Sequence, residues 1–211
     1  MKTLVKICGI NSPNAMTAAL EAEADFIGLV FHPSSPRFVE IEVAAYLAGY
    51  VPDSVKTVGL FVEPDDKTLT ETLENVRIDM IQLHGMESPR RVADIKARFG
   101  LPVIKALPIS SRDDLLDADD YASSADWLLF DAKGTADQPG GHGLPFDWAL
   151  LKDFQSPLPW MLAGGLTPSN VAEAVALLRP PAVDVSSGVE ASRGIKDPAK
   201  IRAFIEAARS L

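Results

Sequence analysis

The segment TLVKICGINSP, residues 3–13, contains a complete strand-to-helix transition. Its first half, Thr3–Cys8, is rich in apolar and β-branched residues and predicts a short buried strand. Ser12-Pro13 then provides a typical helix start, because serine accepts a backbone hydrogen bond at the N-cap and proline is favoured at the first helical position. The segment therefore predicts a β-strand followed directly by an α-helix, with Cys8 at the carboxyl end of the strand.

The same strand-then-helix unit is repeated along the whole chain. Ser88-Pro89 repeats the helix start, and Asp65-Asp66 places acidic residues at another, where they interact favourably with the helix dipole. Seven further strands are expected at Phe26–Phe31, Lys56–Val62, Ile78–His84, Pro102–Ala106, Trp127–Asp131, Trp160–Ala163 and Ala182–Val185. Helices are expected at 12–23, 41–50, 65–75, 88–99, 113–121, from 147 onward, at 167–178 and at 197–208.

Eight such units of about 25 residues favour an α/β fold of the closed (β/α)8 TIM-barrel type, because strands that alternate with helices form a parallel sheet. We expect one domain over residues 1–211, since no linker, low-complexity segment or change of composition divides the chain. The alternative is an open, doubly wound sheet. The first turn lacks the G-x-G-x-x-G fingerprint of dinucleotide-binding sheets, which favours the barrel.

The composition is that of an ordinary globular protein, with 47% hydrophobic and 23% charged residues. No apolar stretch reaches the roughly 18 residues that span a bilayer, and Met1 leads into a strand without a signal-peptide pattern, so we expect no membrane partner. A single cysteine forms no internal disulfide, which fits a cytoplasmic location and excludes thiolate-rich metal sites. The net charge of −9, without a run of Lys or Arg, argues against nucleic acid.

The active site of a (β/α)8 barrel lies at the carboxyl ends of its strands. Lys6 faces the same way as Cys8, and a nearby ammonium lowers the pKa of a thiol. This neighbour favours a reactive thiol over the alternative, a small buried apolar side chain. The location of the active site at the strand ends selects Cys8, His32, Gln82, His84, Asp131, Gly164, Gly165 and the segment from Asp184 to Gly188 as candidate site residues.

Asp131 ends the sixth strand, which lies roughly opposite the first in an eight-stranded barrel. A thiolate base and a carboxylic acid that face each other suit an isomerisation in which two protons move. The alternative for Asp131 is a turn or cap residue. His84 is more often simply a hydrogen-bonded polar residue, and three histidines without ligand spacing predict no metal site.

Two late segments predict a phosphate site. Gly164-Gly165 ends the seventh strand and Ser186-Ser187-Gly188 follows the eighth, and both leave backbone N–H groups available to an anion. Phosphate sites in these two loops recur in this fold. Arg37 follows the second strand, where its planar guanidinium matches a carboxylate, although it could be a surface residue. The glycine-rich residues 139–143 predict a loop after the sixth strand, either a lid or a connector.

Together these motifs resemble the phosphoribosylanthranilate isomerase family of tryptophan biosynthesis. The resemblance runs in order from residue 6 to residue 190 and is specific in combination. It is carried by Lys6-Ile7-Cys8-Gly9, Phe31-His32-Pro33-Ser34-Ser35-Pro36-Arg37, Gln82-Leu83-His84-Gly85, Leu129-Phe130-Asp131, Gly140-Gly141-x-Gly143 with Phe146-Asp147-Trp148, Ala163-Gly164-Gly165-Leu166 and Asp184-Val185-Ser186-Ser187-Gly188-Val189-Glu190.

The resemblance implies a cofactor-free Amadori rearrangement of N-(5-phosphoribosyl)anthranilate, the third step from chorismate to tryptophan. Cys8 resembles the general base, Asp131 the general acid and Arg37 the residue that holds the carboxylate. Substrate contacts are further implied for Gln82, His84, Gly141, Gly164, Gly165, Asp184, Ser186, Ser187 and Gly188. His142 departs from the family, which usually has a small hydroxyl residue there.

Alternatives remain at this point. Another sugar-phosphate barrel enzyme is the nearest, but the histidine-pathway isomerase uses two carboxylates, which Cys8 disfavours. A non-catalytic phosphate-binding barrel would need neither Cys8 nor Asp131. We expect a monomer that binds a small phosphorylated substrate, with a homodimer as the alternative.

Overall fold

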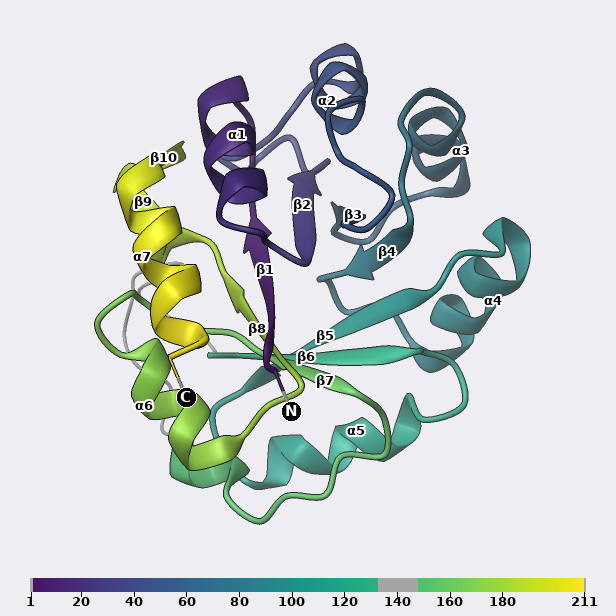
Figure 1. Ribbon diagram of the computed structural model, residues 1–211. Coiled ribbons are helices and arrows are strands. Elements are labelled where there is room, and N and C mark those ends of the chain that lie inside the picture. The colour runs from purple at the N-terminus through teal and green to yellow at the C-terminus, as the bar shows by residue number, and fades with distance from the viewer. Residues whose placement is uncertain (1, 133–147, 211) are drawn as a thin grey trace.

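The computed structural model describes residues 2–132 and 148–210. Eight parallel strands form a closed barrel in which each strand pairs with the next along the chain and the last pairs with the first. Figure 1 shows the helices arranged around these strands. The (β/α)8 prediction is therefore confirmed. The strands are β1 (Leu4–Cys8), β2 (Phe26–Val30), β3 (Lys56–Phe61), β4 (Met80–Leu83), β5 (Val103–Ile109), β6 (Trp127–Ala132), β7 (Trp160–Leu162) and β8 (Ala182–Val185).

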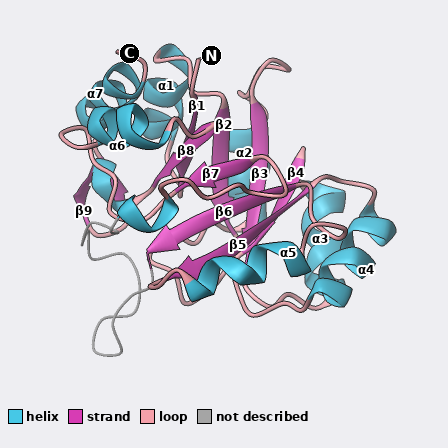
Figure 2. Ribbon diagram, turned by 90° about the horizontal axis from the view of Figure 1, so that it is seen from below, coloured by secondary structure: helices cyan, strands magenta, loops and turns pink. Residues whose placement is uncertain are grey.

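The α-helices begin where the sequence provides caps. Side chains of Ser12, Asp65, Ser88 and Asp197 each accept a hydrogen bond from a backbone N–H in the first turn of the helix that follows. Figure 2 shows helices on the outside of the strands, and α7 packs beside α1 where the ring closes. The helices are α1 (Pro13–Glu21), α2 (Ile41–Ala48), α3 (Asp66–Asn75), α4 (Pro89–Phe99), α5 (Asp117–Asp120), α6 (Val171–Leu178) and α7 (Pro198–Ala208).

Three predicted elements differ from the structure. The helix expected from Thr167 begins at Val171, because the Asn170 side chain accepts from the Thr167 N–H and donates to the Gly165 carbonyl, which forms a turn instead. The helix expected from residue 147 is a 3-10 turn, Trp148–Leu151, and a 3-10 turn at Asp113–Leu116 precedes α5. A 3-10 turn (Ser187–Val189) and the antiparallel hairpin β9 (Glu190–Ser192) and β10 (Ile195–Lys196) follow β8, and the sequence did not predict this hairpin.

Aspartates fasten neighbouring strands at the amino-terminal end of the barrel. Asp25, Asp79 and Asp126 directly precede β2, β4 and β6. Their carboxylates accept hydrogen bonds from the backbone N–H of Val5, Thr57 and Val103 at 2.8, 2.8 and 2.9 Å, and their own N–H groups donate to the carbonyls of the same three residues. This end of the barrel is therefore structural.

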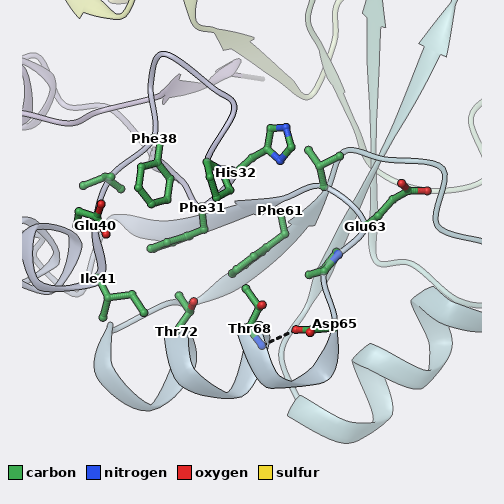
Figure 3. A pocket seen from close by; sticks show the side chains of 14 residues that line it. Phe31, His32, Phe38, Glu40, Ile41, Phe61, Glu63, Asp65, Thr68 and Thr72 are labelled. Carbon is green, nitrogen blue, oxygen red and sulfur yellow. Dashed lines mark hydrogen bonds between the residues drawn. The ribbon is translucent and has the colours of Figure 1, made fainter.

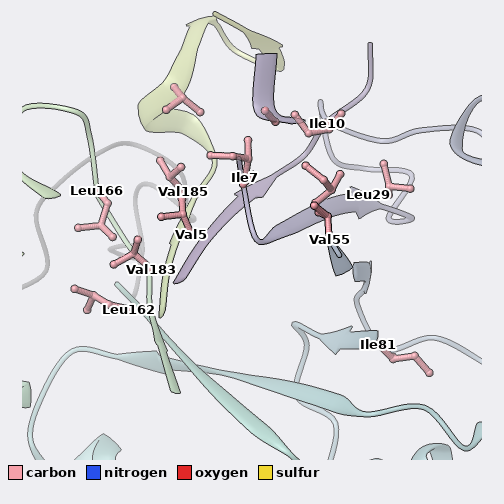
Figure 4. Close-up of a cluster of buried hydrophobic side chains, with 14 of the residues drawn as sticks. Val5, Ile7, Ile10, Leu29, Val55, Ile81, Leu162, Leu166, Val183 and Val185 are labelled. Atoms are coloured by element: carbon pink, nitrogen blue, oxygen red, sulfur yellow. The ribbon is translucent and has the colours of Figure 1, made fainter. Parts of the chain in front are cut away.

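The apolar core has two parts, which follow from the alternation of side chains along each strand. Outward-facing residues such as Val5, Ile7, Val183 and Val185 belong to the large cluster that also includes helix residues such as Ala15 and Phe204. Figure 4 shows these four side chains on β1 and β8. Inward-facing residues fill the lower barrel, among them Phe26, Val58, Met80, Ile104, Leu129 and Met161. Within the described ranges, no helix is both long and apolar enough to cross a bilayer.

A buried ion pair lies outside the barrel wall. The Lys105 ammonium is 2.8 Å from the Glu87 carboxylate, and both side chains are only 2% exposed. Since Ile104 and Ala106 belong to the interior cluster, Lys105 between them points away from the barrel axis. Glu87 also accepts hydrogen bonds from the N–H groups of Glu63 and Gly85, so this pair stabilises the loops after β3 and β4.

Candidate active site

Cys8 and Asp131 lie near the carboxyl ends of β1 and β6, on the inward-facing positions of their strands. Three strand-to-strand steps, through β7 and β8, separate them around the barrel. Cys8 is buried, with 4% of its surface exposed, whereas the Asp131 side chain is 33% exposed. The predicted base and acid thus occupy the same end of the barrel on different walls.

Lys6 and Asp184 form an ion pair below Cys8. They are direct partners in the register between β1 and β8, and the Lys6 Nζ donates to the Asp184 Oδ1 at 2.7 Å. The two side chains are 0% and 9% exposed. The sequence predicted an ammonium beside the thiol and a substrate-binding aspartate, and the structure shows that the two are bonded to each other.

The pKa of Cys8 is raised, which corrects the expectation that Lys6 makes the thiol acidic. Burial is the largest cause, because it disfavours the charged thiolate. Lys6 and Lys196 lower the pKa and Asp184 raises it, but burial outweighs the two ammonium groups. Gly28 directly opposes Cys8 in the register with β2, and a Cβ at Gly28 would lie 2.9 Å from the sulfur, so the glycine makes room for the thiol.

Gln82, His84 and Asp131 form a hydrogen-bonded chain. The Gln82 Nε2 lies 3.0 Å from the His84 Nδ1, and the His84 Nε2 lies 3.3 Å from the Asp131 Oδ2. With the Gln82 amide nitrogen as donor to Nδ1, the imidazole tautomer that carries its proton on Nε2 directs that N–H at Asp131. The structure therefore connects His84 to the predicted acid, a contact that the sequence did not indicate.

The two predicted phosphate segments meet directly. Gly164 and Gly165 adopt φ values of +85° and +67°, which favour glycine. A Cβ at Gly188 would lie 1.8 Å from the Leu166 carbonyl oxygen, so the loop after β8 packs on the loop after β7 with no room for a side chain. Within the described part of the chain, the N–H groups of Gly165, Ser187 and Gly188 are not used in hydrogen bonds between residues. This geometry suits an anion.

Lys196 is a site residue that the sequence analysis missed. Its ammonium donates to the Ser186 carbonyl at 2.8 Å, to the Ser186 Oγ at 3.2 Å and to the Glu190 carboxylate at 3.0 Å. The Ser186 hydroxyl, predicted to contact substrate, is therefore engaged by Lys196. Burial lowers the pKa of Lys196, although Glu190 and Cys8 act in the opposite direction. The sequence did not indicate that Lys196 is buried, because it directly precedes the helix start Asp197-Pro198, where an exposed lysine is expected.

Arg37 lies in the loop after β2 and is held by Glu190. Its Nε donates to one carboxylate oxygen at 2.6 Å and its Nη2 to the other at 3.1 Å. The Arg37 side chain is 16% exposed. The residue predicted to bind a carboxylate of the substrate thus already binds a carboxylate of the protein through one edge of its guanidinium.

The remaining predicted residues lie elsewhere. Gly141, with the rest of residues 139–143, falls outside the described residues. His32 lines a separate cavity of about 440 Å³ between α2 and α3, in which Phe31 and Phe61 stack at 5.2 Å (Figure 3). This cavity contains none of the other predicted site residues. Among the described residues, no group of three His, Cys, Asp or Glu side chains could hold a metal ion.

Comparisons with known proteins show which family the chain resembles over nearly its whole length. The family model described as N-(5'phosphoribosyl)anthranilate (PRA) isomerase matches residues 5–207. The N-(5'-phosphoribosyl)anthranilate isomerase of Paramagnetospirillum magneticum is 55% identical over 211 residues, which cover 99% of this chain and 98% of the relative.

Two solved structures are similar over 99% of this chain and 100% of theirs, both at 35% identity. One is a phosphoribosyl anthranilate isomerase in complex with reduced 1-(o-carboxyphenylamino)-1-deoxyribulose 5-phosphate, with a TM-score of 0.87. The other shows mutually generated monomers of the dimeric phosphoribosylanthranilate isomerase from Thermotoga maritima, with a TM-score of 0.86.

Proposed function

Because the chain belongs to the N-(5'-phosphoribosyl)anthranilate isomerase family, we propose that it converts N-(5-phosphoribosyl)anthranilate into 1-(2-carboxyphenylamino)-1-deoxyribulose 5-phosphate, with Cys8 as general base and Asp131 as general acid. The observation that carries the assignment is the placement of a buried thiol and a half-buried carboxylate on different walls of the same barrel mouth. Proton transfer alone accounts for the reaction, so it requires no cofactor or metal.

The reaction needs two proton transfers at the sugar, followed by a tautomerisation. Asp131 gives its proton to the ribose ring oxygen as the bond from that oxygen to C1′ breaks, and the aniline nitrogen supplies the electron pair that forms the C1′ Schiff base. The Cys8 thiolate then removes the proton from C2′, which gives an enolamine. The C2′ hydroxyl loses its proton and C1′ gains one, so that the ketose forms and the product is an isomer of the substrate. Cys8 then releases its proton to solvent and Asp131 takes one up, which restores the starting protonation of both groups.

The surrounding charges support these roles. Lys6 and Lys196 lower the pKa of Cys8 and so partly offset the larger effect of burial, which raises it. The His84 Nε2–H directs a donor at one oxygen of Asp131 and fixes the rotation of this carboxyl group. A proton donor with a fixed orientation is effective because the geometry of proton transfer is prepared before the substrate arrives.

The ends of the substrate match two separate parts of the site. The N–H groups of the loops after β7 and β8, at Gly165, Ser187 and Gly188, suit its phosphate. Gly164 and Ser186 shape these loops, Asp184 holds Lys6, and Gly141 is assigned by resemblance only. Arg37 suits the carboxylate, because it carries further N–H groups beyond those bonded to Glu190.

Turnover of N-(5-phosphoribosyl)anthranilate by purified wild type, Cys8→Ser and Asp131→Asn tests the proposal. Loss of a positioned acid or base costs about 10²–10⁴-fold in rate, and each variant should lose at least this much. The variants should keep the unfolding midpoint of the wild type within a few degrees, since each replacement side chain is close in size to the one that it replaces. Wild-type rates in both variants would exclude this mechanism, and absence of turnover by the wild type would exclude the activity.

We further propose a single-domain cytoplasmic monomer. The described strands β1–β8 belong to one barrel, which supports a single domain. The dimeric relative from Thermotoga maritima keeps a homodimer as the alternative. Sedimentation velocity over a range of protein concentrations distinguishes the two, because a dimer would sediment faster and dissociate on dilution.

A further inference from the structure

Glu190, the first residue of β9, accepts four hydrogen bonds with its carboxylate. One oxygen accepts from the Arg37 Nε at 2.6 Å and the Lys196 Nζ at 3.0 Å. The other accepts from the Arg37 Nη2 at 3.1 Å and the Gly194 N–H at 3.0 Å. The side chain is 5% exposed, and its backbone carbonyl accepts from Lys200 at 2.6 Å. Glu190 thus joins three segments of the chain: the loop after β2, the β9–β10 hairpin and helix α7.

Glu190 bonds one edge of the Arg37 guanidinium, and no other residue among 2–132 and 148–210 bonds this group. A guanidinium carries five N–H groups, of which Glu190 takes two, on Nε and Nη2. Of the remaining three, one on Nη1 and one on Nη2 form the end-on edge, which can bind a second carboxylate through two parallel hydrogen bonds. Glu190 therefore selects which edge of Arg37 is presented to a ligand.

Two glycines allow close packing around Arg37, one against its side chain and the other against the residue before it. Gly9, directly after Cys8, has a φ of +77°, and a Cβ there would lie 2.8 Å from the Arg37 Cδ. Gly194, in the turn of the hairpin, has a φ of +82°, and a Cβ there would lie 2.4 Å from the Pro36 carbonyl oxygen. The Arg37 side chain thus packs on the backbone at Gly9, next to Cys8. The β9–β10 hairpin packs at Gly194 on the loop after β2, which carries Arg37.

Lys196 connects the same carboxylate to the phosphate segment. Its ammonium bonds both Glu190 and Ser186, the residue before Ser187 and Gly188. Arg37 and Lys196 carry two positive charges against the single negative charge of Glu190, so the group retains a net positive charge toward an anionic ligand. Burial raises the pKa of Glu190, but the Arg37 and Lys196 bonds outweigh it and hold the pKa below its usual value.

We propose that Glu190 is a positioning residue that orients Arg37 so that its end-on edge receives the carboxylate of the substrate. The proposal rests on the proposed function, because it assumes that a carboxylated phosphoribosyl amine is turned over. It differs from a purely structural role for Glu190 in one measurable respect: orientation of Arg37 matters only for a substrate that carries the carboxylate.

The test compares two substrates in wild type, Glu190→Gln, Arg37→Ala and the double variant. N-(5-phosphoribosyl)aniline keeps the phosphoribosyl group but lacks the carboxylate, and its enzymatic rate is measured above the uncatalysed rate. The readout is the ratio of kcat/KM for the two substrates. Glutamine offers one oxygen and places an NH2 group against existing donors, so it releases Arg37. Any effect on the phosphate loop through Lys196 acts on both substrates and cancels in the ratio.

We expect Glu190→Gln to lower the preference for the carboxylated substrate by about tenfold or more, mostly through KM, as loss of one charge-assisted contact does. Arg37→Ala should lower it at least as much, and Glu190→Gln should have no further effect on the ratio in the Arg37→Ala background. An unchanged ratio in Glu190→Gln, or an equal loss for both substrates, overturns the proposal while wild-type turnover leaves the proposed function intact.

Two controls keep the result interpretable. Asp126→Asn removes a carboxylate that holds a backbone N–H and a lysine at the opposite end of the barrel, and it should leave the ratio unchanged. If Glu190→Gln does not fold, Glu190→Asp keeps the charge but withdraws it by one methylene. Glu190→Asp should give a kcat/KM ratio between those of the wild type and Arg37→Ala. A folded Glu190→Asp variant with the wild-type ratio would overturn the proposal.

Discussion

Replacing Lys6 with methionine removes one partner of the ion pair inside the barrel and leaves the Asp184 carboxylate buried without its counter-charge. The Nζ of Lys6 lies 2.7 Å from Asp184, and the two side chains are 0% and 9% exposed. Methionine keeps the approximate length and the apolar stem of lysine. The substitution therefore tests the charge with little change in packing.

The expected loss of stability follows from this burial. Breaking a buried pair by removing one partner costs about 3–5 kcal/mol. For a chain of 211 residues, 1 kcal/mol corresponds to about 2–4 °C in Tm, so we expect a decrease of about 6–20 °C. Calorimetry at neutral pH measures it directly.

The same substitution should move the pH profile of kcat/KM. A general base acts when deprotonated, so the rate rises with pH up to the pKa of Cys8. Lys6 lowers this pKa more than Asp184 raises it, so loss of Lys6 moves the acidic limb to higher pH even if Asp184 takes up a proton. The rate at neutral pH should then fall, and part of it should return at alkaline pH.

Lys105→Met is the matched control, because Lys105 forms an equally buried pair with Glu87 outside the barrel wall. It should destabilise the protein to a similar extent, since it also leaves a buried carboxylate without a counter-charge. It should not move the acidic limb. The reasoning is refuted if Lys6→Met keeps the wild-type Tm, or if both variants shift the limb equally.

Three further predictions concern other parts of the molecule. Gly188→Ala would place a methyl group 1.8 Å from the Leu166 carbonyl oxygen, so the two phosphate loops must separate; inorganic phosphate should inhibit at least about tenfold more weakly, whereas unchanged inhibition would place the phosphate elsewhere. Asp126→Asn should reduce the free energy of unfolding, measured with urea, by about 1–3 kcal/mol without lowering kcat, and a lost kcat would contradict a structural role. Folding raises the pKa values of Cys8 and Lys6 from 9.0 and 10.5, so the free energy of unfolding that they contribute is present below pH 9.0 and is lost as the pH rises through the folded values. In Cys8→Ser this decrease should begin nearer pH 10, where Tyr121, whose pKa is also raised, starts to contribute, and a decrease that still begins near pH 9 would count against a raised thiol pKa.

The sequence predicted the barrel because its signals are local. Strand and helix starts follow from periodicity and from caps such as Ser12 and Asp65, which act within a few residues. The β8 strand was predicted with its observed bounds. The strand predicted for β4, Ile78–His84, begins two residues before the observed strand and ends one residue after it. The hairpin of β9 and β10 was missed because strands of three and two residues carry no periodicity, and polar contacts of Glu190 and Lys196 hold them.

The partners of the site residues could not be predicted for a different reason. Lys6 meets Asp184 only because the first strand pairs with the last when the barrel closes, a contact across 178 positions of the chain. His84 contacts Asp131 because the carboxyl ends of β4 and β6 bring the two side chains together at the mouth of the barrel. The residue types and strand ends were visible in the sequence, but the registers that join them arise from closure of the sheet.

The polar interior near the mouth opposes stability and therefore requires a functional reason. An apolar pair at the Lys6 and Asp184 positions would fit the lower barrel, and such replacements are often neutral or stabilising by about 1–4 kcal/mol. The ion pair instead places an ammonium beside a thiol whose pKa burial raises, and the ammonium partly offsets that rise. The carboxylate of Asp184 then keeps that ammonium charged, because Coulombic attraction to it raises the pKa of Lys6 against the effect of burial. A buried base is protected from solvent and from oxidation, but it needs a buried cation, and the cation needs a buried anion. Cys8, Lys6 and Asp184 therefore act as one unit. The apolar side chains of the barrel interior offset the free energy that is needed to bury these three polar groups.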